Sequence, residues 1–206
     1  MGPVLIEFAT ESKYGESETL MYEKQIKEAL TSHLDRYRRN KTTSAYLEEV
    51  QINGGLVRAD LVDVRSMHCY EIKSDLDTLK RLHSQGSRYG KVFDNVTLVT
   101  SERHLARAMT MVPTWWGIML IPAPGNCVFS RIKYGRANHN VDRYTLVTLL
   151  DKQEVLDVMD RHGKARGWKS KSLYILQQRL ADMIPISCLK TEVQACLFRR
   201  INHFYC

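Results

Sequence analysis

The strongest local signal in the chain is the triplet Asn53-Gly54-Gly55, which stands between two runs of strand-forming residues. Asn and Gly accept the positive φ angles of tight hairpin turns, so residues 46–52 and 56–64 are predicted to pair as antiparallel strands. A third run, residues 67–73, follows after only Arg65-Ser66 and predicts a second hairpin. The rest of the chain must therefore fold around three consecutive antiparallel strands.

Helical and strand patterns alternate on both sides of these strands. Apolar side chains recur at helical spacing over residues 19–38, and Ser74 and Asp77 have the spacing of a capping box that would start the next helix. The later predicted elements are a strand at 95–100, a helix at 102–111, a strand at 116–121 and helices at 148–161, 171–183 and 187–203. This alternation predicts an α/β fold.

The composition divides the chain into three predicted parts. Residues 1–18 are expected to be a flexible lead-in, residues 19–146 the α/β core with a basic loop at 123–145, and residues 147–206 a small C-terminal helical region. The chain has 30 Lys and Arg against 23 Asp and Glu, a net charge of +7, which favours polyanionic partners such as nucleic acid.

Neither a membrane span nor a secretion signal is predicted. There is no run of about 18 apolar residues, and the N-terminus lacks a basic segment followed by an apolar one. The five cysteines are widely spaced and form no CxxC motif, which fits a reducing compartment. We therefore expect a cytoplasmic protein without a zinc site.

The second predicted hairpin brings charged side chains together. If the strands turn at Arg65-Ser66, Asp60 lies opposite Glu71, and Lys73 shares the face of Glu71 because side chains alternate along a strand. Two facing carboxylates repel each other, and a divalent cation such as Mg²⁺ would relieve that repulsion. The alternative is an exposed ladder of ion pairs.

These residues also resemble a known family. Asp60 in RADLVDV and Glu71-Ile72-Lys73 in CYEIKSD are similar to the motif of the PD-(D/E)XK nuclease superfamily, and QGSRY, with Gln85 and Tyr89, is similar to the QxxxY element of RecB-like nucleases. The predicted order αβββαβ agrees with that superfamily. The resemblance implies a restriction-endonuclease-like core, in a bacterial or phage branch, with helices flanking a mixed sheet.

The resemblance also implies an activity. A member would hydrolyse phosphodiester bonds in DNA with Mg²⁺ or Mn²⁺, and Lys73 would position the water or stabilise the transition state. Asp60, Glu71, the Ile72 carbonyl and a glutamate of the first helix would bind the metal. Gln85 would lie near the phosphate with Tyr89 beside it.

The first-helix glutamate is open to several assignments. Glu23 lies three residues before Ile26 and so shares the buried face of the helix, whereas Glu28 points away. Glu48 and Glu49 on the first strand are alternatives. We expect Glu23 to complete the site.

Basic and aromatic residues outside this site predict how nucleic acid would be held. The expected contacts are Arg88, Tyr89, Lys91, Arg131, Lys133 and Arg136. A second basic cluster, loosely similar to SAP-type modules, contains Lys164, Arg166, Lys169 and Lys171. A homodimer is compatible with the resemblance, and the alternative function is a non-catalytic nucleic-acid-binding or interaction protein that retains the nuclease fold.

Overall fold

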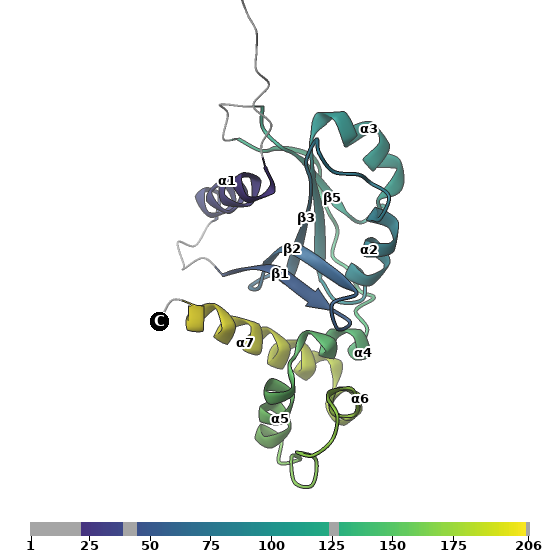
Figure 1. The fold of residues 1–206 in the computed structure, drawn as a ribbon. Coiled ribbons are helices and arrows are strands. Elements are labelled where there is room, and N and C mark those ends of the chain that lie inside the picture. The colour runs from purple at the N-terminus through teal and green to yellow at the C-terminus, as the bar shows by residue number, and fades with distance from the viewer. Residues whose placement is uncertain (1–21, 39–44, 124–127, 205–206) are drawn as a thin grey trace, which may run out of the picture.

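The computed structural model describes residues 22–38, 45–123 and 128–204, so the predicted lead-in at 1–18 lies outside the described residues. Helices and a mixed β-sheet alternate in an α/β fold (Figure 1). The elements are α1 (Glu23–Arg36), β1 (Tyr46–Ile52), β2 (Val57–Asp63), β3 (His68–Lys73), α2 (Leu82–Tyr89), β4 (Asn95–Thr100), α3 (Glu102–Met111), β5 (Gly117–Leu120), β6 (Ser130–Lys133), α4 (Arg143–Leu146), η1 (Val147–Leu149), α5 (Lys152–Arg161), α6 (Leu173–Met183) and α7 (Ile186–Phe204).

The six strands follow one another across the sheet in chain order, β1-β2-β3-β4-β5-β6. The β1/β2, β2/β3 and β5/β6 pairs are antiparallel, whereas β3/β4 and β4/β5 are parallel. The parallel pairs are joined by α2 and α3, as parallel neighbours require a crossover. The α/β class and the mixed sheet predicted from the sequence are confirmed.

The first hairpin forms where the sequence predicts it. Asn53, Gly54 and Gly55 have φ angles of 52°, 66° and 88°, which the turn requires and which most other residues resist. The second hairpin also has the predicted register, with Leu61 opposite Tyr70 and Val62 opposite Cys69.

Two local predictions are wrong. The helix expected from Ser74 begins only at Leu82, because the Asp77 carboxylate accepts hydrogen bonds from both the backbone N–H and the hydroxyl of Ser74 and closes a turn instead. The basic loop expected at 123–145 contains a strand, β6, and the short helix α4, whose N-cap Asp142 accepts from the Thr145 N–H.

Helices cover the two faces of the sheet unequally. Figure 1 shows α1 on one face and α2 with α3 on the other. Against α1 lies a small core in which Ile26 and Leu30 pack on Leu61, Ile72 and the strands beside them. The opposite core is larger, and Trp116, Tyr89 and Phe93 are its bulkiest side chains.

The C-terminal helices belong to this larger core. Buried residues of α5, α6 and α7 form one continuous cluster with those of the sheet. Polar contacts reinforce the packing, since Lys190 pairs with Asp94 at 2.5 Å and the Gln194 amide donates to the Val64 carbonyl at 2.7 Å. None of the helices among the described residues is both long and apolar enough to cross a membrane.

Candidate functional site

The sheet opens at one point, between β2 and β3. The two strands pair over three residues each: Asp63 faces His68, Val62 faces Cys69 and Leu61 faces Tyr70. Beyond them, the Asp60 carboxylate accepts a hydrogen bond of 2.7 Å from the Ile72 N–H, so a side chain takes the position of the next strand-to-strand bond. Asp60 therefore lies at a fork in the sheet.

The neighbouring strand is irregular at the same level. Glu48 pairs with Leu61 and Val50 with Ala59, so the residue between them, Glu49, faces Asp60. Glu49 has a φ of 56°, which is uncommon for a residue with a side chain. The irregularity turns its carboxylate towards Asp60 instead of leaving it in the regular strand alternation.

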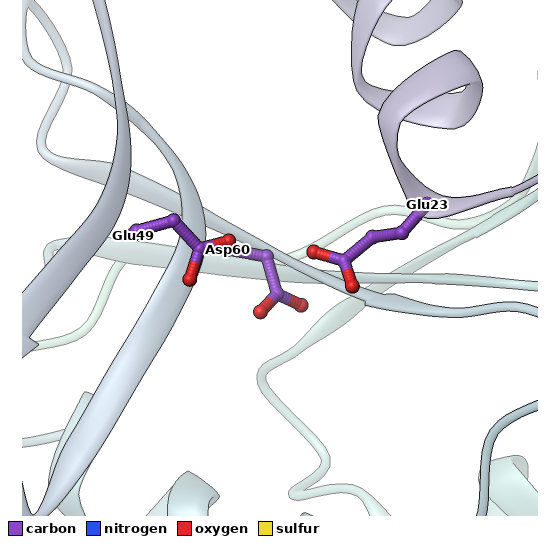
Figure 2. A group of neighbouring side chains, drawn as sticks. All are labelled: Glu23, Glu49 and Asp60. Carbon is purple, nitrogen blue, oxygen red and sulfur yellow. The ribbon is translucent and has the colours of Figure 1, made fainter.

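Three carboxylates converge at the fork. Figure 2 shows Glu23 reaching from α1 towards Glu49 and Asp60, and one oxygen from each of the three lies within 4.8 Å of the others. Carboxylate oxygens are the ligands that Mg²⁺ and other hard divalent cations prefer. The donor set is therefore of the type that such an ion takes.

A protein cation already lies among these carboxylates. The Lys27 ammonium is 2.7 Å from Glu23, also pairs with Glu49, and is 3.8 Å from Glu48. Lys27 is only 5% exposed, whereas Lys24 and Glu28 on the same helix are exposed. Arg58 pairs with the second oxygen of Glu49. The cluster is thus partly neutralised by its own side chains.

Glu71 is held separately, with both of its oxygens occupied. It is fully buried; one oxygen lies 2.5 Å from the Lys73 ammonium and the other 2.6 Å from the Tyr89 hydroxyl. The Gln85 amide approaches the same hydroxyl at 3.4 Å. The structure thus brings Glu71, Lys73, Gln85 and Tyr89 into one buried network beside Asp60, while Glu23 and Glu49 meet Asp60 from the other side.

The proximity of these charges changes their protonation. Burial and the negative charge of Glu71 raise the pKa of Asp60 to about 7. Burial alone would lower the pKa of Lys73, but the charges of Glu71, Asp60 and Asp77 raise it above the ordinary value. Near neutral pH the site therefore holds a carboxyl group that exchanges its proton and an ammonium that keeps its charge.

Asp60 should make stability depend on pH. Its pKa is above the usual 3.8 in the folded protein, which therefore binds more protons than the unfolded chain between about pH 4 and pH 7. The free energy of unfolding then falls as pH rises through that window. The reference protein is Asp60→Asn, which keeps a hydrogen-bond acceptor for Ile72. Relative to it, the free energy of unfolding of the unsubstituted protein should fall by about 2–4 kcal/mol as pH rises from about 4 to about 7.

Urea unfolding in EDTA at several pH values would measure this difference. Carboxylates shared by the two proteins cancel in the comparison. If the free energy of unfolding depends on pH in the same way in both proteins, ionisation of Asp60 does not destabilise the fold.

The basic residues predicted to hold nucleic acid come from two parts of the chain, the end of α2 and the segment from β6 onward. Arg131 lies on the α1 side of the sheet, close enough to His33 of α1 for its charge to act on that ring. Burial of His33 lowers its pKa most, and the positive charges of Arg36 and Arg131 lower it further. Arg88 and Lys91 belong to the end of α2, which packs on the opposite face. Lys133 and Arg136 follow Arg131 at and beyond the end of β6.

Tyr89 is the clearest correction among these residues. It is fully buried between Phe93 and Trp116, and its hydroxyl reaches Glu71 and the Arg58 carbonyl. No base or phosphate can reach its ring, so it is a packing residue. The helical spacing of Gln85 and Tyr89 is consistent with a shared face, but that face is directed into the core.

Sequence reasoning missed Lys27 and placed Glu49 only among the alternatives. Lys27 has the appearance of an ordinary helical lysine, and Glu49 ranked below Glu23 as a ligand. The position of Lys27, one residue after Ile26 and three before Leu30, was the available signal that it faces the buried side. No sequence pattern predicted the positive φ angle at Glu49.

A second charged feature is far from this cluster in the sequence, at the turn between α5 and α6. Residues 161–179 contain six Lys and Arg and no Asp or Glu. The four central cations, Lys164, Arg166, Lys169 and Lys171, are all exposed, and none of them pairs with a carboxylate among the described residues.

Comparison with known proteins gives a different family from the one expected. The matching family is described as bacteriophage P4 protein cII, and the match covers residues 16–205. Protein cII of Enterobacteria phage P4 is 28% identical over 147 residues, which are 70% of this chain and 55% of the relative. The chain thus spans little more than half the length of that relative. No solved structure matches the chain.

This match overturns the expected membership of the PD-(D/E)XK nuclease superfamily, and with it the expected nuclease and hydrolase activity. An acidic residue followed by Glu-x-Lys on the next strand is a short pattern, and a buried ion pair satisfies it as well as a catalytic centre does. The phage origin suggested by the resemblance is consistent with the match.

Proposed function

Because the chain belongs to the bacteriophage P4 protein cII family, we propose that it is a non-catalytic regulatory protein that binds nucleic acid. The observation that carries the proposal is the exposed, acid-free basic turn between α5 and α6. Its four exposed cations, Lys164, Arg166, Lys169 and Lys171, pair with no carboxylate among the described residues and form a local positive field suited to phosphates.

The internal neutralisation of the acidic residues supports a non-catalytic role. A hydrolytic metal centre needs carboxylate oxygens that are free to bind the ion and a position open to substrate. Here Lys27 and Arg58 pair with Glu49, while Lys73 and Tyr89 occupy Glu71. In this proposal the chain retains the αβββαβ arrangement of a restriction-endonuclease-like core and uses its charged residues to stabilise that core.

The test is a binding assay with the full chain. Fluorescence anisotropy with a labelled DNA should show binding in EDTA, without any requirement for Mg²⁺, and the affinity should fall steeply as salt rises. The DNA should remain intact after incubation with Mg²⁺ or Mn²⁺. Absence of binding at low salt, or cleaved DNA from a preparation that loses the cleavage on Asp60→Ala substitution, would overturn the proposal.

We also propose that the Glu23, Glu49 and Asp60 cluster binds a divalent cation, Mg²⁺ or Mn²⁺, in competition with Lys27. The ammonium of Lys27 lies among the same oxygens, so the ion must displace it. Replacing Lys27 by methionine should therefore raise the affinity for Mn²⁺ about tenfold or more, since it removes one positive charge from the site.

Isothermal titration of Mn²⁺ into the two proteins measures this difference. Lys24→Met is the matched control, because Lys24 is exposed on the same helix and pairs with none of these carboxylates among the described residues. Equal affinities in all three proteins, or no heat in any of them, would mean that the cluster is only an ion-pair network.

A further inference from the structure

The first turn of α6 exposes three consecutive apolar side chains. Leu173, Tyr174 and Ile175 are 37%, 69% and 44% exposed. They directly follow the basic turn, whose last cation is Lys171 and whose Ser172 caps the helix. Single exposed apolar residues are common on protein surfaces, but three together beside a cluster of cations indicate a surface that meets a ligand.

The basic turn is hollowed next to this apolar tip. A cavity of about 500 Å³ is lined by Asp160, Ala165, Arg166, Gly167, Lys169 and Ser170. Its volume is within the range of small-molecule sites, roughly 300–1,000 Å³. The space is large enough for a phosphate or a single nucleotide.

The tip and the cavity lie within reach of one strand of nucleic acid. Tyr174 is four positions after Ser170, so their Cα atoms are at most about 14 Å apart. Stacked bases are spaced by about 3.4 Å along one strand, so roughly four of them span that distance.

The aromatic ring available for stacking is that of Tyr174. Trp168 is partly buried, and Arg179 already lies over its ring at 5.3 Å. Exposed aromatic rings bind unpaired bases of any sequence by stacking, and such rings work together with cations that follow the backbone. In a duplex the faces of the bases are covered by their neighbours, so Tyr174 has nothing to stack on except at an end or a distortion.

We propose that the turn between α5 and α6 binds nucleic acid with unpaired bases, with a phosphate at Arg166 and Lys169 in the cavity and a base stacked on Tyr174. This inference rests on the proposed nucleic-acid-binding function and names its substrate class.

The test compares labelled oligothymidine of 20 or so nucleotides with a mixed-sequence duplex of equal length, in EDTA, by fluorescence anisotropy. The full chain should bind the single strand more tightly than the duplex. Tyr174→Ala should weaken single-strand binding about tenfold and leave duplex binding unchanged, as expected for the loss of one stacked base. Tyr174→Phe keeps the ring and should bind like the unsubstituted chain.

Tyr134→Ala is the matched control, since Tyr134 is 79% exposed and lies beyond β6, outside this surface. Equal single-strand and duplex affinities, or an equal loss for both ligands on Tyr174→Ala substitution, would overturn the inference but leave the proposed function standing. Failure of the unsubstituted chain to bind either ligand would overturn both.

Discussion

Replacing Lys73 by methionine should lower the free energy of unfolding by about 3–5 kcal/mol, which is the usual cost of removing one partner from a buried ion pair. Glu71 has no exposed surface, and Lys73 provides the positive charge 2.5 Å from one of its oxygens. Without that charge, the Glu71 carboxylate would be buried beside Asp60 with the Tyr89 hydroxyl as its remaining close partner.

Chemical denaturation measures this loss, and the double substitution Glu71→Gln with Lys73→Met is the decisive companion. It removes both charges, so it should recover most of the stability that Lys73→Met alone loses. Lys80→Met, at an exposed position, should change stability by less than about 0.5 kcal/mol. A Lys73→Met protein as stable as the unsubstituted one would show that Glu71 is not charged in the fold.

The Lys73 prediction distinguishes two roles for the same motif. If Lys73 positioned a water for hydrolysis, as the family resemblance implied, its loss would remove activity and leave the fold intact. In the structure, the Lys73 ammonium instead pairs with the carboxylate of Glu71, two residues earlier on the same strand. Strand alternation places such a pair on one face in many proteins, so the motif by itself cannot tell a catalytic pair from a stabilising one.

Local sequence signals predicted the part of the fold that local chemistry determines. Asn53-Gly54-Gly55 determines the first hairpin, and the turn at residues 64–67, centred on Arg65-Ser66, gives the register in which Leu61 faces Tyr70. The predicted strand at 95–100 and helix at 102–111 match β4 and α3 because each is a clear periodic segment with a defined end.

The site depends on longer-range relations, which the sequence does not display. Lys27 reaches Glu49 across 22 residues, and Tyr89 reaches Glu71 across 18. The fork at Asp60 exists because its side chain replaces a strand-to-strand hydrogen bond, and the capping motif at Ser74 was used to close a turn. These outcomes follow from tertiary contacts that override local preference.

The largest effect on binding is expected when the basic turn loses its charge. Replacing Lys164, Arg166, Lys169 and Lys171 by glutamine removes four cations and lowers the net charge from +7 to +3. Each phosphate contact contributes about −0.9 to the slope of log affinity against log salt. Loss of four contacts should therefore make the slope less steep by about 3.6. Relative to a 1 M reference, this corresponds to a loss of roughly 4,000-fold in DNA affinity at 0.1 M salt.

The control for this variant must change net charge equally while sparing the turn. Glutamine at Lys24, Lys80, Arg107 and Lys152 also lowers the net charge from +7 to +3, and all four positions are exposed and lie outside the turn. If nucleic acid is held by the overall positive charge of the protein, both variants should lose the same affinity and the same salt slope. If it is held at the turn between α5 and α6, the control should keep nearly all of its slope. The ratio of the two slopes therefore decides whether binding belongs to a defined site or to the charge of the whole chain.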